Sequence, residues 1–173
     1  MNTHQEITEA FADLFAKISA GLKSIPNPNE KPENGSWSIR EEFEHMVRSG
    51  RMVASALKQP KLILRSFGKP NRPLRDYDAT FQRYEERLAT LTADPKSPAF
   101  PREGGDEMEK LLIQWDEIGE KFAKRLQKWS EKDLDNYLLP HPLMGKILVR
   151  EMLFFTHFHS LHHFGKILGR AEK

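Results

Sequence analysis

Four histidines gather in one short stretch of the sequence. The segment HFHSLHHF, residues 157–164, holds four of the seven histidines in a chain of 173 residues. An α-helix turns about 100° per residue, so His159 and His163 would lie one above the other on the same face. Two imidazoles at this spacing can reach one ion, as they do in helical zinc motifs. The segment is therefore a candidate for one side of a metal site, with His162 beside the pair and His157 pointing elsewhere.

A metal site needs more than this pair, because a catalytic metal usually has three protein ligands and an open position. Outside the segment the sequence has only His4, His45 and His141. His45 lies in the middle of a predicted helix and off its apolar stripe, where a ligand that faces a cleft would have to lie. The spacing also fits a second interpretation, in which the histidines are surface or hydrogen-bonded side chains at a helix end.

Three charged residues near these histidines are candidates for catalytic roles. Glu41 and Glu42 precede His45 by about one turn and could orient a ligand or act as a general base. We favour the plainer interpretation, in which both are solvated acids in the first turn of their helix. Lys166 falls on the same arc of its helix as the histidine pair, where a cation could tune the site or bind an anionic group.

The composition describes a single globular domain. The chain is 38% hydrophobic and 30% charged with a formal net charge of +2, and it has no block of like charges that would indicate nucleic-acid binding. No apolar run approaches the ~18 residues of a membrane span, and the first residues lack the pattern of a secretory signal. Cysteine is absent, which excludes disulfides, thiolate ligands and a cysteine nucleophile. We therefore expect one cytoplasmic domain over residues 1–173, with a small-molecule substrate and no nucleic-acid or membrane partner.

Helical periodicity dominates the sequence, and no segment shows a strong strand pattern or an internal repeat. Apolar residues recur at helical spacing in four long segments, residues 3–25, 36–60, 106–130 and 147–171, and in the short segment 79–92. Thr3 with Glu6 predicts a capping box for the first helix, and Ser36 or Ser38 would cap the second. Four long helices with one short extra helix and long loops predict an all-α four-helix bundle. Residues 60–78 form a long basic connection, which either shapes a binding site or is a solvated crossover.

The last predicted helix is apolar on two sides. One arc holds the histidine pair and consists of Leu148, Met152, Phe155, His159, His163 and Lys166. The opposite arc is apolar throughout and consists of Phe154, Phe158, Leu161, Phe164 and Leu168. A four-helix monomer does not obviously need both arcs, so we predict a homodimer in which the second arc contacts a partner. In the alternative, the second arc is the bundle core and the histidine arc lines a cleft.

Two motifs are familiar in combination. In WSIREEFEHM, a Trp-Ser start is followed by a histidine eight residues after the tryptophan, from Trp37 to His45. In HPLMGKILVREMLFFTHFHSLHHFGKI, a His-Pro-x-x-Gly turn leads into a helix that carries His-x-x-x-His. Both motifs and their spacing along the chain resemble the DinB/YfiT-like family, whereas residues 60–105 carry no matching motif. The resemblance implies an up-up-down-down four-helix bundle, often dimeric, with a divalent metal, commonly zinc or nickel, held by His45, His159 and His163.

The resemblance also bounds the function. Some members of the family resemble thiol-dependent S-transferases that use bacillithiol, mycothiol or glutathione, and others are known only as metal-dependent hydrolases or damage-inducible proteins. We therefore expect a metal-dependent transferase or hydrolase, with a low-molecular-weight thiol as cosubstrate in the first case. Lys166 stands where many relatives have glutamine, so the substrate of a relative does not transfer directly. Two other hypotheses stay open: a metal-binding stress protein without turnover, and a structural bundle whose histidines are incidental.

Overall fold

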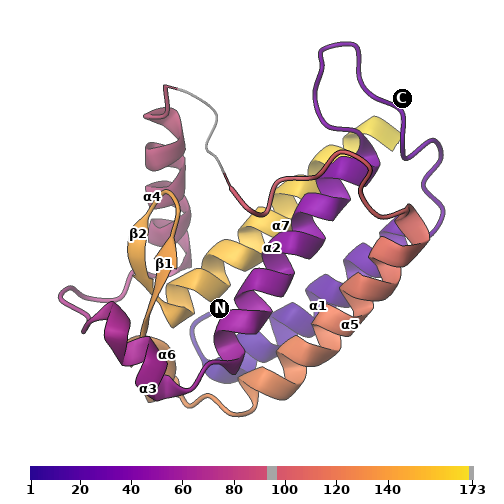
Figure 1. The fold of residues 1–173 in the computed structure, drawn as a ribbon. Coiled ribbons are helices and arrows are strands. Elements are labelled where there is room, and N and C mark those ends of the chain that lie inside the picture. Colours follow the sequence, from indigo (N-terminus) through magenta and orange to yellow (C-terminus); the bar gives the residue numbers. More distant parts are fainter. Residues whose placement is uncertain (93–96, 172–173) are drawn as a thin grey trace.

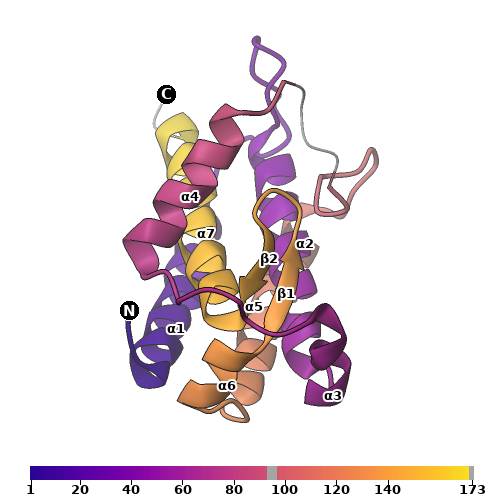
Figure 2. The ribbon, with the colours of Figure 1, turned by 90° about the vertical axis from the view of Figure 1, so that its left-hand side faces the viewer.

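Four long helices form the bundle that the periodicity predicts (Figure 1). The computed structural model describes residues 1–92 and 97–171. The long helices are α1 His4–Leu22, α2 Ile39–Lys58, α5 Met108–Leu126 and α7 Val149–Ala171. Helices α5 and α7 each pack on both α1 and α2, so the four enclose one core. The shorter helix α4, Tyr77–Ala89, lies outside the bundle against α7 (Figure 2).

Capping residues set where the helices begin. Thr3 caps α1 and forms the predicted capping box with Glu6, in which each side chain accepts a hydrogen bond from the other residue's backbone N–H. Ser38, rather than Ser36, caps α2, and the side chain of Glu41 accepts the backbone N–H of Ser38 at 2.8 Å. A cap of this kind contributes about 1 kcal/mol to stability. The carboxylate of Glu41 is thereby used at the start of α2.

Apolar stripes from all four long helices meet in the core. Its largest fully buried side chains include Phe11, Phe43, Trp115, Phe122 and Phe154. The ring of Phe11 stacks on that of Phe122 with centroids 4.9 Å apart. The indole N–H of Trp115 donates to the backbone carbonyl of Phe15, so this buried polar group is paired. Burial of a large apolar side chain contributes about 1.5–3 kcal/mol, and this aromatic core therefore holds the four helices together.

The two arcs of α7 face different surroundings. Phe154, Phe158 and Phe164 of the second arc are buried inside the chain, and Leu168 is 37% exposed. The arc that carries the histidine pair lines a cavity instead. The histidine arc thus lines a cleft, as the alternative interpretation has it, whereas the second arc is divided: Phe154 and Phe164 belong to the core, and Phe158 packs on Tyr84 of α4. The homodimer stays a prediction, which light scattering tests against the chain mass of 20.1 kDa.

A short β-hairpin before α7 departs from the sequence prediction. Between α6, Glu131–Asn136, and α7, strand β1, Leu138–His141, pairs antiparallel with β2, Gly145–Leu148. We predicted a connector here and a helix from residue 147, because strands of four residues are too short to show a clear alternation. Gly145 has a φ of 73°, a left-handed conformation that glycine adopts readily, at the end of the turn. Both strands pack on α7.

The long basic connection after α2 is exposed over most of its length but is anchored to α7 at one point. It begins with α3, Lys61–Leu64, and a 3₁₀ turn, Arg65–Phe67. Beyond them, Arg72 donates two guanidinium N–H groups to the carboxylate of Glu151, at 2.6 and 2.5 Å, and the backbone N–H of Arg75 donates to it at 2.9 Å. Burial alone would raise the pKa of Glu151, but these hydrogen bonds outweigh burial and lower the pKa. This ion pair, in which Glu151 is buried and Arg72 is partly exposed, therefore holds the connection and the start of α4 against α7.

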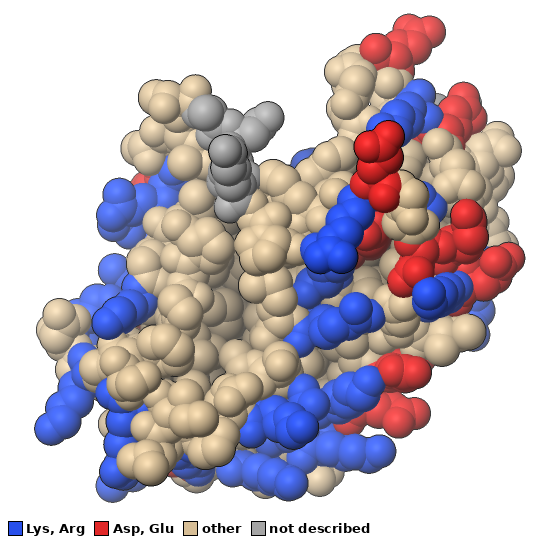
Figure 3. Space-filling view, viewed as in Figure 1, with Lys and Arg blue, Asp and Glu red and all other residues tan. Residues whose placement is uncertain are grey.

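The surface in the view of Figure 3 carries charges of both signs around an uncharged hollow. Basic side chains predominate on the left and along the lower edge and acidic ones gather on the right, whereas the surface between α4 and α2 is mostly uncharged and recessed. Among the described residues, no helix combines the length and the hydropathy that spanning a bilayer would require.

His141 closes the hairpin turn through a ring nitrogen that must be unprotonated. Its Nδ1 accepts the backbone N–H groups of Leu143 and Met144, each at 3.1 Å, and burial lowers the pKa of His141 to about 4. Protonation at Nδ1 would place a third N–H against these two donors. The unfolded chain has the ordinary histidine pKa of ~6.5, so protons favour unfolding increasingly as the pH falls from there toward 4.

We expect His141→Asn to remove this acid sensitivity, because the asparagine Oδ1 can accept the same N–H groups and cannot be protonated. Between pH 7 and 5, the free energy of unfolding of the wild type should fall by about 2 kcal/mol more than that of the variant. Denaturant titrations at each pH measure both values, and the remaining histidines are common to the two proteins. Curves that stay parallel from pH 7 to 5 would contradict the prediction.

Candidate metal centre

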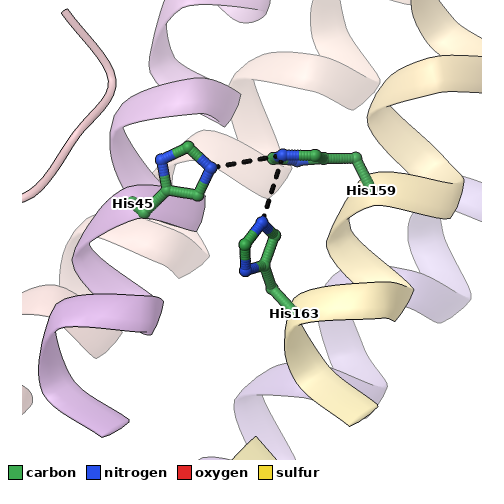
Figure 4. A group of neighbouring side chains, drawn as sticks. All are labelled: His45, His159 and His163. Atoms are coloured by element: carbon green, nitrogen blue, oxygen red, sulfur yellow. Dashed lines mark hydrogen bonds between the residues drawn. The ribbon is translucent and has the colours of Figure 1, made fainter. Parts of the chain in front are cut away.

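Three histidines from two helices converge on one point (Figure 4). His45 lies on α2, and His159 and His163 lie one turn apart on α7. The Nε2 atom of His159 is 3.2 Å from Nε2 of His45 and 3.2 Å from Nε2 of His163. One ligand atom from each ring lies within 4.8 Å of the other two, and all three residues are buried.

The packing of α2 on α7 brings the three rings together. The i, i+4 spacing stacks His159 over His163, as the sequence predicts, and His45 leaves α2 toward the same point. Trp37, just before the cap of α2, packs its ring 5.2 Å from that of His45 and 6.5 Å from that of His163, measured between centroids. The indole therefore covers one side of the cluster and limits the rotation of both rings.

Hydrogen bonds at Nδ1 fix the tautomers of two of the rings. Nδ1 of His45 lies 3.0 Å from the backbone carbonyl of Ala99, which can only accept, so this nitrogen carries the proton. Nδ1 of His163 lies 2.5 Å from a carboxylate oxygen of Glu42 and donates to it by the same reasoning. In both residues Nε2 is then the unprotonated nitrogen, with its lone pair directed at the cluster.

Glu42 is buried behind the cluster and is not a solvated acid. It is 3% exposed, and its second carboxylate oxygen accepts a hydrogen bond from Arg170 at 3.2 Å. The same arginine donates to the backbone carbonyl of Trp37. Our sequence interpretation of both first-turn acids is therefore wrong for Glu42, whereas Glu41 serves the cap of α2 and pairs with Lys31 at 3.1 Å. A carboxylate behind a histidine in this way orients the ring and raises its basicity as a ligand.

All three rings are neutral at physiological pH. Burial lowers the pKa of His45, and burial lowers that of His159 well below its ordinary value, with repulsion from the other two rings adding to the effect. Burial also lowers the pKa of His163 to about 2, again with a contribution from His45. A protonated ring would lose hydration in this buried environment, and it would repel a second protonated ring at this range. Neutral imidazole is the form that binds a metal ion.

The donor set and its spacing fit a divalent ion. Zinc–nitrogen bonds of ~2.0–2.1 Å at angles between ~90° and ~110° require nitrogens about 2.9 to 3.4 Å apart. The two distances of 3.2 Å fall within that range. Imidazole nitrogens suit zinc, nickel, copper and iron, and three protein ligands leave further positions open. The three buried histidines could therefore hold a metal ion, as the sequence predicts.

The other four histidines have different partners. His162 is exposed beside the cluster and lines the cavity, and the ring of His163 lies edge-on to it at 5.3 Å. His157 faces away and bonds the hydroxyl of Tyr77 at 2.9 Å. His4 bonds the backbone carbonyl of Leu126, and His141 serves the hairpin turn. None of these four is part of the cluster of three.

The cluster opens into a cavity of about 550 Å³. Its walls come from α2, α7, α4, the hairpin, the crossover after α2 and the loop over residues 97–100. Lys166, the third charged candidate from the sequence, lines this cavity, whereas neither Glu41 nor Glu42 does so. Burial raises the pKa of Tyr84, another lining residue, so its phenol stays protonated at neutral pH.

Sequence reasoning missed several residues of this site. Ala99 contributes a backbone carbonyl from a loop, and no side-chain pattern could reveal it. Phe100 packs edge-on against Trp37 at 5.1 Å, and the spacing of aromatics in that loop carries no helical or strand period. Arg170 lies in the last turn of α7, where a basic residue is common because it interacts favourably with the helix dipole. Its position in the sequence therefore does not indicate a role in the site. Its contact with Glu42 joins residues 128 positions apart.

The chain matches known proteins over most of its length. A family model described as the DinB superfamily matches residues 27–167. The uncharacterized protein YuaE of Bacillus subtilis strain 168 is 24% identical over 154 residues, which cover 84% of this chain and 83% of YuaE. The solved structure of YfiT from Bacillus subtilis, described as a probable metal-dependent hydrolase with an unusual four-helix bundle topology, aligns with a TM-score of 0.60. At 16% identity, over 96% of this chain and 84% of YfiT, this likeness confirms the predicted fold.

The adjacent residues His162 and His163 provide a matched pair of variants for the site. We expect His163→Ala to weaken metal binding by orders of magnitude, because its Nε2 lies 3.2 Å from that of His159. His162→Ala lies one position away and removes the same side chain from the same helix. It should leave the metal content near that of the wild type, with at most a ~10- to 100-fold change in affinity if the ring orients a ligand.

Competition with a chelator at fixed pH measures both affinities, after circular dichroism has shown that both variants remain helical. Loss of the metal from His162→Ala together with its retention by His163→Ala would contradict the assignment of the cluster.

Proposed function

This chain belongs to the DinB superfamily, and from that membership and the three-histidine cluster we propose that it is a metal-dependent enzyme of the hydrolase type. The observation that carries the proposal is the convergence of three neutral imidazoles at the wall of a cavity. His45, His159 and His163 would hold the ion, which we expect to be zinc or nickel. The description of YfiT as a probable metal-dependent hydrolase of the same fold supports the reaction class.

A divalent ion, when bound, supplies a positive centre that lowers the pKa of a water or thiol beside it. The residues of the chain keep the donors ready for it. Ala99 and Glu42 hold the Nδ1 protons of two rings, so that Nε2 stays free on each. Arg170 balances the charge of Glu42, and burial keeps a proton off all three rings. Because the three histidines and their hydrogen-bond partners are already in place, the side chains need to move little when a metal ion binds.

Thiol transfer is a second candidate for the reaction. A cavity of about 550 Å³ beside the cluster is large enough for a low-molecular-weight thiol and an electrophile together, within the usual size range of ligand sites. A metal-binding stress protein without turnover would keep the cluster and lack activity. Esters and amides, tested beside electrophiles with bacillithiol, mycothiol or glutathione, separate these three proposals. If metal-loaded protein turns over neither the esters and amides nor the electrophiles with thiols, the non-catalytic role remains.

We expect one divalent ion per chain. Elemental analysis of protein purified without a histidine tag should return about one equivalent of zinc or nickel. The double variant His159→Ala with His163→Ala should contain none, because a single imidazole remains. Metal that persists at full stoichiometry in the double variant would place the ion elsewhere.

The neighbouring acids of α2 give a sharper test of how the site is held. Glu42→Gln keeps the size of the side chain and can still accept from His163, but it removes the negative charge behind the ring. We expect metal affinity to fall about 10- to 100-fold. Glu41→Gln makes the same change one residue earlier, at the cap of α2, and should leave metal affinity unchanged.

Chelator competition at pH 7.5 compares the two variants with the wild type. Equal effects of the two substitutions on metal affinity would argue that Glu42 acts only through the stability of α2.

A further inference from the structure

The cavity beside the three histidines differs in character along its length. With a rise of 1.5 Å per residue, Lys166 lies about 10 Å along α7 from His159 in one direction, and Met152 lies about 10 Å away in the other. Both side chains line the cavity. The histidine cluster therefore lies between two ends of the cavity, one at Lys166 and the other beyond Met152.

The end beyond Met152 is mostly apolar, although Gln59 and His141 also line the cavity there. The crossover after α2 contributes Ile63, Leu64 and Phe67, and the hairpin contributes Leu139 and Leu143. Three apolar side chains that line the cavity are also strongly exposed: Met52 at 46%, Ile63 at 49% and Leu88 at 43%. Large apolar side chains around a concave site are typical of a surface that a ligand covers, because the ligand then removes their contact with water.

The charge of the cavity has one sign. Among its lining residues in the described ranges 1–92 and 97–171, Lys166 is the only Lys, Arg, Asp or Glu. Within those ranges, Lys166 makes no ion pair, since no carboxylate lies within 4.0 Å of its ammonium group. The nearby carboxylate of Glu42 is already held between His163 and Arg170. A divalent ion on three neutral imidazoles would add further positive charge, and no lining acid would offset it.

We infer that the cavity binds an amphiphilic anion, a molecule with an unbranched or aromatic apolar body and one anionic group. Lys166 holds the anionic group, and the apolar body extends past the histidine cluster toward Met152 and the crossover. The bond that reacts then lies between the two, over the cluster. The position of a reacting bond over the cluster, which makes this molecule the substrate, rests on the proposed function. The binding of the amphiphile stands on the shape and charge of the cavity.

Alkyl carboxylates test the charge of the ligand. Isothermal titration calorimetry on the metal-loaded protein at pH 7.5 compares decanoate with decanamide and with decyltrimethylammonium, which share its chain. We expect decanoate to bind roughly 5- to 10-fold more tightly than decanamide, and the ammonium compound to bind least well. Lys166→Gln should abolish the preference for decanoate over decanamide. Lys124→Gln, which removes an equal charge from an exposed position on α5, should preserve it.

Chain length tests the apolar end. In the wild type, affinity should rise steadily from hexanoate to decanoate as more of the cavity is filled. Ala56 lines the cavity about 16 Å along α2 from His45, so Ala56→Phe should fill the apolar end. The variant should bind decanoate at least tenfold more weakly than the wild type and hexanoate equally well. If Ala56→Phe fails to fold, the length series in the wild type still decides the question.

Three outcomes would overturn the inference. Affinity that is independent of chain length would remove the apolar end. Equal or tighter binding of the ammonium compound would remove the preference for an anion. A preference for decanoate that survives Lys166→Gln would place the anionic group on the metal ion or elsewhere. Metal analysis of the same samples separates this inference from the proposed function. If the protein takes up no metal during loading and still binds decanoate through Lys166, the proposed function is wrong and the inference holds.

Discussion

The packing of α2 against α7 is the contact on which the candidate site depends. It places Nε2 of His159 3.2 Å from Nε2 of His45 and 3.2 Å from Nε2 of His163, a spacing that favours neutral rings or a shared ion. Burial supplies the first condition by lowering the pKa of each ring. Glu42 reinforces the same contact, because its carboxylate, on α2, joins His163 and Arg170, both on α7. The geometry of the site and the cohesion of the two helices therefore have one origin.

The features that the sequence predicted are local ones. Helical stripes and the capping box of Thr3 and Glu6 depend on residues within a few positions of each other, and the structure has them where the periodicity placed them. The pairing of His159 with His163 is local in the same sense. The addition of His45 depended on the resemblance to a family, since a contact across 114 positions leaves no periodic trace in one sequence. With it, the bundle and the three histidines could be predicted together.

The features that the sequence did not predict are long-range or very short. The strands of the hairpin have four residues each, too few for a pattern, and their pairing depends on packing against α7. The crossover is held by the ion pair of Arg72 and Glu151 across 79 positions. Glu42 resembles any acid in a first helical turn until α7 is in place, after which it is 3% exposed. In each case tertiary contacts decided between alternatives that local sequence leaves equal.

The cavity has walls of two kinds, and this has a consequence for how such a protein can diverge. The histidines project from two long helices of the core, where a substitution disturbs packing on every side. The crossover, the hairpin and the loop that carries Ala99 and Phe100 are instead connections between helices, which tolerate insertions and deletions far better. Lineages with this architecture can therefore lengthen, shorten or exchange those connections and acquire new ligand preferences, while selection holds the ion-binding pair of helices nearly constant.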